Sequence, residues 1–381
     1  MDKTTKIIIG IVIAIIIIGG VWWGISKKST TSEEMSEKET IKIGVSAALT
    51  GEVSIWGQNG LAGILLATEE TNKDGGVNGK RIEIIPEDDK SLPAEAANAF
   101  NKLVNIDKVT AIIGASGSGA SASAVAVAQN ASLPFVIAFA SAPHLTMTGD
   151  YIFRVTPSDA FQGKYSAEFV YNEMKAKKVA LIYVKNDWGE GVQKVFKKRF
   201  IELGGEIVYL SGVLPTDNDF RTEIAKVKKS DAELLYFPVY PDVALSFFKQ
   251  MREVDLNLPI VAGDAIEGEE VIENDYAEGI IYTLPKINVP DDFKEKIRAL
   301  SGFENLKVTI AAPLSYDATK ILFSAMEKSG TDREKIRNEL IKISYKGVSN
   351  PVIEFDENGD LKAAVFEAKI IKDKQSFPYK N

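Results

Sequence analysis

Small residues and hydroxyls lie between a short apolar run and an alanine-rich segment near the first third of the chain. The run Ala111 to Gly114 has the length and β-branched content of a buried parallel strand. Glycines and serines then lead from Gly114 to Gly119 into a segment of high helix propensity. A helix that begins here points free N–H groups, its positive dipole end and the Ser118 hydroxyl at one spot. Because no lysine stands nearby to favour phosphate, the stretch predicts a carboxylate cradle led by Ser118.

Three other interpretations of this stretch exist. Gly117-x-Gly119-x-x-Ala122 matches a loose dinucleotide fingerprint, but the acidic residue expected about 20 positions later is absent. A phosphate-binding Walker loop is absent too, because no Gly-Lys-Ser/Thr follows. The small residues could also serve only to pack the helix closely on the sheet.

Composition removes several function classes. The 381 residues suffice for two domains, and a net charge of −8 without a basic run argues against nucleic acid as a partner. There is no cysteine, and His144 is the only histidine, so we expect neither a metal site nor a bound cofactor. A serine hydrolase built on the cradle would need His144 as its base and lacks Gly-x-Ser-x-Gly, so we expect no enzyme.

The N-terminus carries an uncharged apolar run from Ile7 to Ile25 behind two lysines. As a helix it would extend about 28 Å, close to the thickness of a bilayer core. Trp22 and Trp23 resemble an interfacial belt, and no clear Ala-x-Ala cleavage site follows. We therefore predict a membrane anchor over residues 1–25, with a cleaved signal peptide as the alternative. The polar residues 26–40 read as a flexible stalk.

The body alternates strands and helices. Strands predicted at Ile41 to Ala48, 81–86, 110–114 and 134–138 are separated by helical patterns, which indicates a parallel sheet covered on both faces. A second series of the same kind runs from Ala160 to Ala262 and implies a second α/β lobe. Helices near 291–300, 311–328 and 332–343 lack strands of their own, so we expect them to complete a lobe already begun.

A hairpin is predicted about Asn358-Gly359, which is a strong turn signal. The pattern Asp356-x-Asn358-x-Asp360 resembles part of a calcium loop. It lacks the distal glutamate of such loops, so we interpret it as a turn.

At this point the chain resembles the type I periplasmic binding proteins of ABC importers, in particular the leucine/isoleucine/valine-binding family. The resemblance covers roughly residues 41–371 and depends on the order and spacing of several motifs. These are Leu49-Thr-Gly with Trp56-Gly, Asn72-x-x-Gly-Gly-Val-x-Gly79, Pro86-Glu-Asp-Asp89, the cradle, Phe139-Ala-Ser-Ala-Pro-x-Leu-Thr146, Tyr151-Ile-Phe-Arg154, Asn186-Asp-Trp-Gly-Glu-Gly191, Gly263-Asp264 and Phe355-Asp-Glu-Asn-Gly-Asp-Leu361.

The resemblance implies a ligand site shared by two lobes. Its hydroxyl and backbone positions, which would hold a carboxylate, fall on Ser118, Phe139, Ala140 and Ser141. Its aromatic positions fall on Trp56, Trp188 and Tyr240. The acid that meets the ligand's ammonium falls on Asp264, one position from where the family often has glutamate.

The fold implied is α/β, with two doubly wound parallel-sheet lobes joined by a multi-strand hinge and preceded by one transmembrane helix. We expect the first lobe to comprise 41–157 and 287–346, and the second 158–286 and 347–381. The implied function is capture of a small amino acid, branched-chain or otherwise apolar, outside the cytoplasm and its delivery to an ABC permease. The alternatives are a ligand-sensing ectodomain of the same fold and a binder of amides or aromatic acids.

Overall fold

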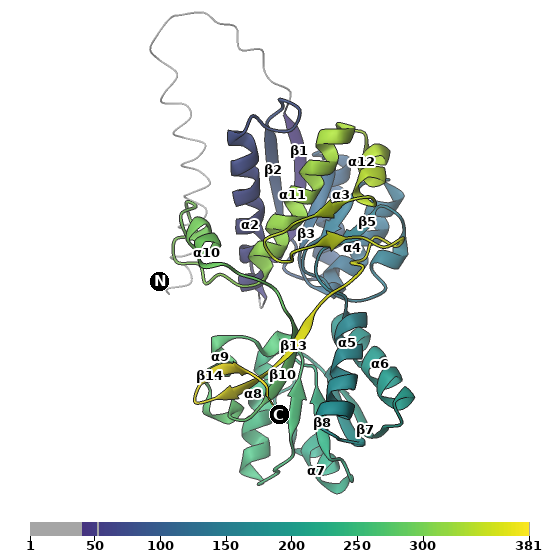
Figure 1. The fold of residues 1–381 in the computed structure, drawn as a ribbon, viewed down its shortest axis with the longest axis vertical. Coiled ribbons are helices and arrows are strands. Elements are labelled where there is room, and N and C mark those ends of the chain that lie inside the picture. The colour runs from purple at the N-terminus through teal and green to yellow at the C-terminus, as the bar shows by residue number, and fades with distance from the viewer. Residues whose placement is uncertain (1–39, 52, 381) are drawn as a thin grey trace, which may run out of the picture.

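The computed structural model describes residues 40–51 and 53–380, which form two α/β lobes (Figure 1). One lobe contains a parallel five-stranded sheet of order β2-β1-β3-β4-β5. The other contains a seven-stranded sheet of order β14-β13-β10-β9-β8-β6-β7, parallel in its central strands. The predicted α/β fold with two lobes and parallel sheets is thereby confirmed.

The first lobe alternates strands and helices as its sequence indicated. Its strands are β1 (Ile41–Ala47), β2 (Ile82–Asp88), β3 (Ala111–Ala115), β4 (Phe135–Ile137) and β5 (Ile152–Arg154). Its helices are α2 (Ser54–Lys73), α3 (Pro93–Asn105), α4 (Ser118–Asn130), α10 (Asp291–Arg298), α11 (Ala311–Ser329) and α12 (Arg333–Leu340). A small ribbon of β11 (Ser344–Tyr345) and β12 (Ile353–Glu354) follows.

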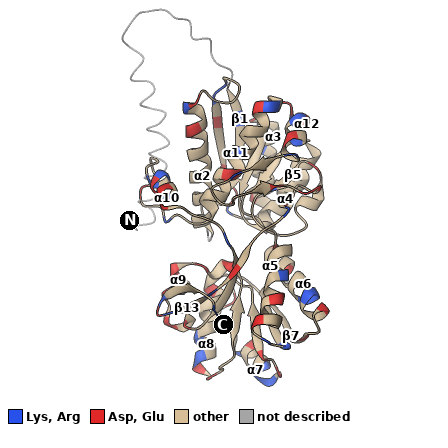
Figure 2. Cartoon of the chain, viewed as in Figure 1, with Lys and Arg blue, Asp and Glu red and all other residues tan. Residues whose placement is uncertain are grey.

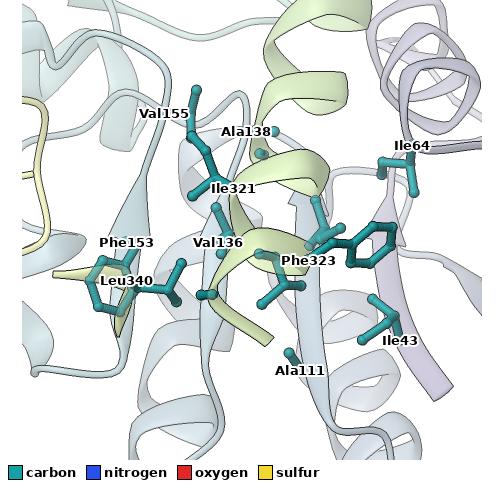
Figure 3. Packing of buried hydrophobic residues seen from close by; sticks show 14 of the residues in the cluster. Ile43, Ile64, Ala111, Val136, Ala138, Phe153, Val155, Ile321, Phe323 and Leu340 are labelled. Atoms are coloured by element: carbon teal, nitrogen blue, oxygen red, sulfur yellow. The ribbon is translucent and has the colours of Figure 1, made fainter. Parts of the chain in front are cut away.

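Two apolar layers enclose the first sheet. On one face, residues of α2, α11 and α12 pack on the strands, among them Ile64, Ile321 and Leu340 (Figure 3). On the other face, α3 and α4 contribute Phe100 and Val125. Helices α11 and α12 therefore complete the lobe begun by β1, as expected from their lack of strands.

The second lobe repeats the arrangement. Its strands are β6 (Lys178–Val184), β7 (Glu206–Val213), β8 (Leu234–Phe237), β9 (Ile260–Ala262), β10 (Ile281–Pro285), β13 (Phe366–Lys372) and β14 (Gln375–Pro378). Its helices are α5 (Asp159–Glu168) with its π-helical extension η2 (Phe169–Glu173), α6 (Asp187–Glu202), α7 (Arg221–Lys229), α8 (Pro241–Glu253), the short η3 (Asp264–Ile266), α9 (Glu269–Ile272) and η4 (Asp275–Ala277). Strands β5 and β10 were not predicted, because a three-residue strand and a strand ending in proline give little pattern to read.

The chain passes between the lobes after β5, after β10 and before β13 within the described residues. The last passage comes later than the expected boundary at residue 347. Ile353, Phe355 and Leu361 pack in the core of the first lobe, so the chain leaves that lobe only after Leu361.

The turn at Asn358-Gly359 is present, with Gly359 at φ +76° and Phe355 bridged to Leu361. The long hairpin expected around it is wrong, because its two sides have other partners. Strand β12 pairs with β11, whereas β13 pairs with β10 and with β14. Asp356 accepts hydrogen bonds from the N–H groups of Asn358 and Asp360, which is the geometry of an Asx turn.

The predicted anchor at Ile7 to Ile25 and the predicted stalk lie outside the described residues. Across 40–51 and 53–380, the structure contains no helix that is both long enough and apolar enough to cross a bilayer.

Candidate ligand site between the lobes

A cavity of about 230 Å³ lies between the lobes. In both sheets the loops that reach it follow the carboxyl ends of parallel strands, near the point where the strand order reverses. All eight residues predicted as ligand contacts line this one cavity: Trp56, Ser118, Phe139, Ala140, Ser141, Trp188, Tyr240 and Asp264. The structure therefore brings together residues that are up to about two hundred positions apart in the sequence.

The cradle has the predicted strand-to-helix form. Ser118 is the first residue of α4, and the preceding Gly117 is extended, with φ −73° and ψ 169°. The Ser118 hydroxyl is almost fully buried and accepts a hydrogen bond from the Ala142 N–H at 3.2 Å. Its own proton stays available to a ligand, because that bond uses only an oxygen lone pair.

A buried acid supports the cradle from behind. Asp89 accepts hydrogen bonds from the Ser46 and Ser116 hydroxyls at 2.6 and 2.7 Å and from the Ser91 N–H at 2.8 Å. Burial raises the pKa of Asp89, and the two serine hydroxyls oppose that rise. The group fixes the loop before Ser118 without entering the cavity, and the sequence showed it only as part of a motif.

The loop after β4 supplies Phe139, Ala140 and Ser141. A fully buried arginine, Arg154, fixes its far end by donating to the Ala142 carbonyl at 2.6 Å. Arg154 also pairs through two nitrogens with the Asp360 carboxylate, which lies in the turn described above. Such a bidentate pair has a defined geometry, so the turn near the end of the chain orients a ligand loop in the first lobe.

Each lobe contributes one stacked aromatic pair to the cavity wall. In the first lobe Trp56 and Phe139 have ring centroids 5.0 Å apart, and in the second Trp188 and Tyr240 are 5.2 Å apart. The Tyr240 hydroxyl accepts a hydrogen bond from the Asn186 amide at 3.0 Å. Stacking and this hydrogen bond fix the rings, which therefore offer an apolar wall of set shape.

Asp264 follows β9 and faces the first lobe across the cavity. Its side chain keeps partial exposure through the cavity, but protein surrounds it on the other sides. This burial raises the pKa of Asp264 to about 6, against the hydrogen bond that Gln162 donates to Oδ1 at 2.9 Å. No lysine or arginine of the described chain lines the cavity, so its charged groups are all acidic: Asp242, Asp264, Glu267 and Glu270.

The hydrolase interpretation has no geometric support. His144 is exposed and does not line the cavity, so Ser118 has no imidazole base beside it. Among residues 40–51 and 53–380, no group of three or more acidic or histidine side chains could hold a metal ion.

Comparison with known proteins gives consistent matches over the whole described body. A family model for periplasmic binding proteins matches residues 40–375. A leucine-, isoleucine-, valine-, threonine- and alanine-binding protein of Pseudomonas aeruginosa is 30% identical over 337 residues, covering 85% of this chain and 88% of the relative.

Solved structures agree. A leucine-binding protein from Thermotoga maritima superposes with a TM-score of 0.80 at 29% identity, covering 89% of this chain and 98% of that one. An isoleucine complex of a branched-chain amino acid transporter substrate-binding protein from Streptococcus pneumoniae gives a TM-score of 0.77 at 30% identity, with the same coverage.

Two doubly wound lobes that share one enclosed, aromatic-walled cavity define a two-lobed solute-binding protein. The chain belongs to the periplasmic binding protein family, with its type I fold, as the ordered motifs indicated. It is accordingly a solute-binding protein of a transporter and not an enzyme, and its binding domain is extracytoplasmic.

Proposed function

We propose that the protein captures a branched-chain or similarly apolar amino acid in this cavity and delivers it to the permease of an ABC importer. One observation carries the choice of ligand. Uncharged donors, which are Ser118 and the first turn of α4, face an acid, Asp264, across an aromatic-walled space. A zwitterion fits this polarity because its carboxylate meets the donors while its ammonium meets the acid.

The cavity volume supports a small ligand. About 230 Å³ lies below the usual 300–1,000 Å³ of pockets for drug-sized molecules. Relatives named for leucine, isoleucine and valine binding support the apolar side chain. In this proposal Ser118, Phe139, Ala140 and Ser141 hold the carboxylate side, Trp56, Trp188 and Tyr240 enclose the side chain, and Asp264 pairs with the ammonium.

Thermal unfolding of the full chain in detergent, with a panel of amino acids, amides and aromatic acids, tests this function. A ligand that binds only the native state at 100-fold excess over Kd stabilises it by about 2.7 kcal/mol. We expect leucine, isoleucine or valine to raise the melting temperature and Ser118→Ala to reduce the shift. Ser121→Ala is the matched control, because Ser121 is buried in the same helix but does not line the cavity. A shift only with ligands that lack an α-ammonium would contradict the amino-acid assignment.

We further propose that residues 1–25 anchor the protein to the membrane and residues 26–40 form a stalk. The uncharged run from Ile7 to Ile25 and its terminal tryptophans support this. N-terminal sequencing of the protein from membrane and soluble fractions tests it. An intact N-terminus in the membrane fraction is expected, and a mature protein that begins near residue 26 would show a cleaved signal instead.

A further inference from the structure

Gln162 is a buried amide that contacts the ammonium-binding acid from behind. It lies on the first turn and a half of α5, is 2% exposed and does not line the cavity. Its Nε2 is 2.9 Å from Asp264 Oδ1 and 3.4 Å from the Thr283 carbonyl oxygen. A carbonyl oxygen can only accept, and so can an ionised carboxylate. The nitrogen and not the oxygen of the amide must therefore face these two groups.

The Gln162 amide thus holds one oxygen of the Asp264 carboxylate from the side opposite the cavity. Lys369 of β13 pairs with the neighbouring acid Glu267 at 2.6 Å. The remaining groups that face Asp264 are acidic or phenolic: Asp159 from α5, Tyr236 from β8 and Glu267 after η3. The neutral Gln162 amide therefore orients this carboxylate and supports its charge.

We infer that Gln162 is a positioning residue for ligand recognition, holding Asp264 ionised and turned toward the ligand's ammonium. The inference rests on the proposed function, in which Asp264 receives that ammonium. One oxygen of the carboxylate is held by the amide, which fixes the plane of the group before any ligand arrives. A preformed acceptor avoids the ordering cost that a free side chain would incur on binding.

A second buried acid lies on the same helix as Gln162. Asp159 is fully buried one turn before Gln162, and neither of its oxygens has a well-aligned hydrogen bond within the described chain. Burial raises the pKa of Asp159 far above its usual range, and the Asp264 carboxylate raises it further. Burial is the largest cause of the raised pKa of Asp264, and the hydrogen bond from Gln162 is the largest cause that opposes it. Without the amide, the pKa of Asp264 would move above about 6.

Calorimetric titration of leucine into the full chain in detergent, from about pH 5 to about pH 8, tests the inference. Gln162→Met preserves length and removes the donor. We expect its Kd to exceed that of the unmodified protein by about tenfold near neutral pH and the difference to shrink as pH rises, because alkaline solution restores the charge on Asp264. A merely structural role would weaken binding by the same factor at every pH. That result, or an unchanged Kd, would overturn the inference.

Two further variants complete the test. Gln193→Met is the matched control, because Gln193 is a buried glutamine of the same lobe that does not contact Asp264; we expect an unchanged pH profile. Gln162→Asn, which keeps an amide but is one methylene too short, should show the same pH-dependent loss if Gln162→Met does not fold. Absence of leucine binding by the unmodified protein would overturn the proposed function together with this inference. Normal binding with a normal Gln162→Met profile would overturn only the inference.

Discussion

The two lobes present opposite chemistry to the cavity on the same architectural plan. The first lobe offers uncharged donors, and a buried acid, Asp89, fixes them from behind. The second offers an acid, Asp264, and a buried amide, Gln162, fixes it from behind. In each case the hidden partner has the polarity that complements the exposed one. The comparison shows that the two sheets place their loops in the same way. The side chains in the loop after each strand then determine which end of the ligand that lobe binds.

The outer surfaces show no such contrast. Lysine and arginine are interspersed with aspartate and glutamate on helices of both lobes (Figure 2). The polarity that distinguishes the lobes therefore lies in the residues that line the cavity.

The largest expected effect comes from removing the charge in the second lobe. Asp264→Asn leaves the ligand's ammonium buried without its counter-ion. Such a truncation costs about 2–5 kcal/mol, or roughly thirtyfold to several-thousandfold in Kd. Calorimetry with leucine measures it, and a loss of less than about threefold would show that the acid does not meet the ammonium.

The corresponding change in the first lobe should be smaller. Ser118→Ala removes one hydrogen bond to a charged group and leaves the Ala142 N–H without its acceptor. We expect a loss of about 1.5–3 kcal/mol in binding free energy, with Ser121→Ala unchanged. A larger loss than for Asp264→Asn would show that the first lobe, and not the second, contributes more to ligand binding.

Lowering the pH should weaken the contact between the ligand's ammonium and the second lobe, and it should leave the carboxylate contact with the first lobe unchanged. The pKa of Asp264 in the free protein is raised to about 6, so leucine affinity should fall below that pH by about tenfold per unit. Ser118→Ala should keep this slope, whereas Asp264→Asn should abolish it. An identical slope in Asp264→Asn would assign the titration to another group.

The folding stability of the ligand-free protein should change with pH in the opposite direction to its affinity for leucine. Folding raises the pKa of Asp264, so the folded state holds this proton more tightly than the unfolded state. Stability from this group is therefore present at acid pH and lost as pH rises through about 6. Asp264→Asn should melt at a higher temperature than the unmodified protein above about pH 6 and at a similar temperature only below about pH 3.8, the usual pKa of aspartate, with the difference growing between the two. Calorimetric scans without ligand check this result.

We expect the smallest effect on leucine affinity from an exposed ion pair that joins the two lobes at the rim of the cavity. Lys307, from the segment packed on the first lobe, pairs with Glu269 of the second at 2.9 Å, and both side chains are about half exposed. Exposed pairs contribute about 0–1 kcal/mol. Lys307→Met should therefore change leucine affinity less than about fivefold, and only at low salt. A greater effect would mean that the rim and not the cavity governs closure.

The repeated strand–helix units and the Ser118 cradle could be predicted from local signals, whereas the other seven cavity residues were placed by the ordered motifs of the resemblance. Periodicity identifies a buried strand, and the residues after it reach the sheet's carboxyl edge. Whether the eight residues bind a ligand stays a prediction. The hydrogen bonds that hold the cavity residues in place could not be predicted, because they join positions far apart in the sequence. Arg154 and Asp360 are 206 residues apart, and Gln162 and Asp264 are 102 apart. Strand β5 was missed because three residues carry almost no periodicity.

The interleaved path of the chain sets an order for its folding during synthesis. The first lobe begins at Ile41, yet its core contains Leu314, Ile336 and Ile353, which leave the ribosome after nearly all of the second lobe. The central strands and helices of the second lobe form an almost continuous stretch from 159 to 285 and lack only β13 and β14. The later-starting half can therefore reach a packed state first, while the earlier half waits with one face of its sheet covered by α2 alone.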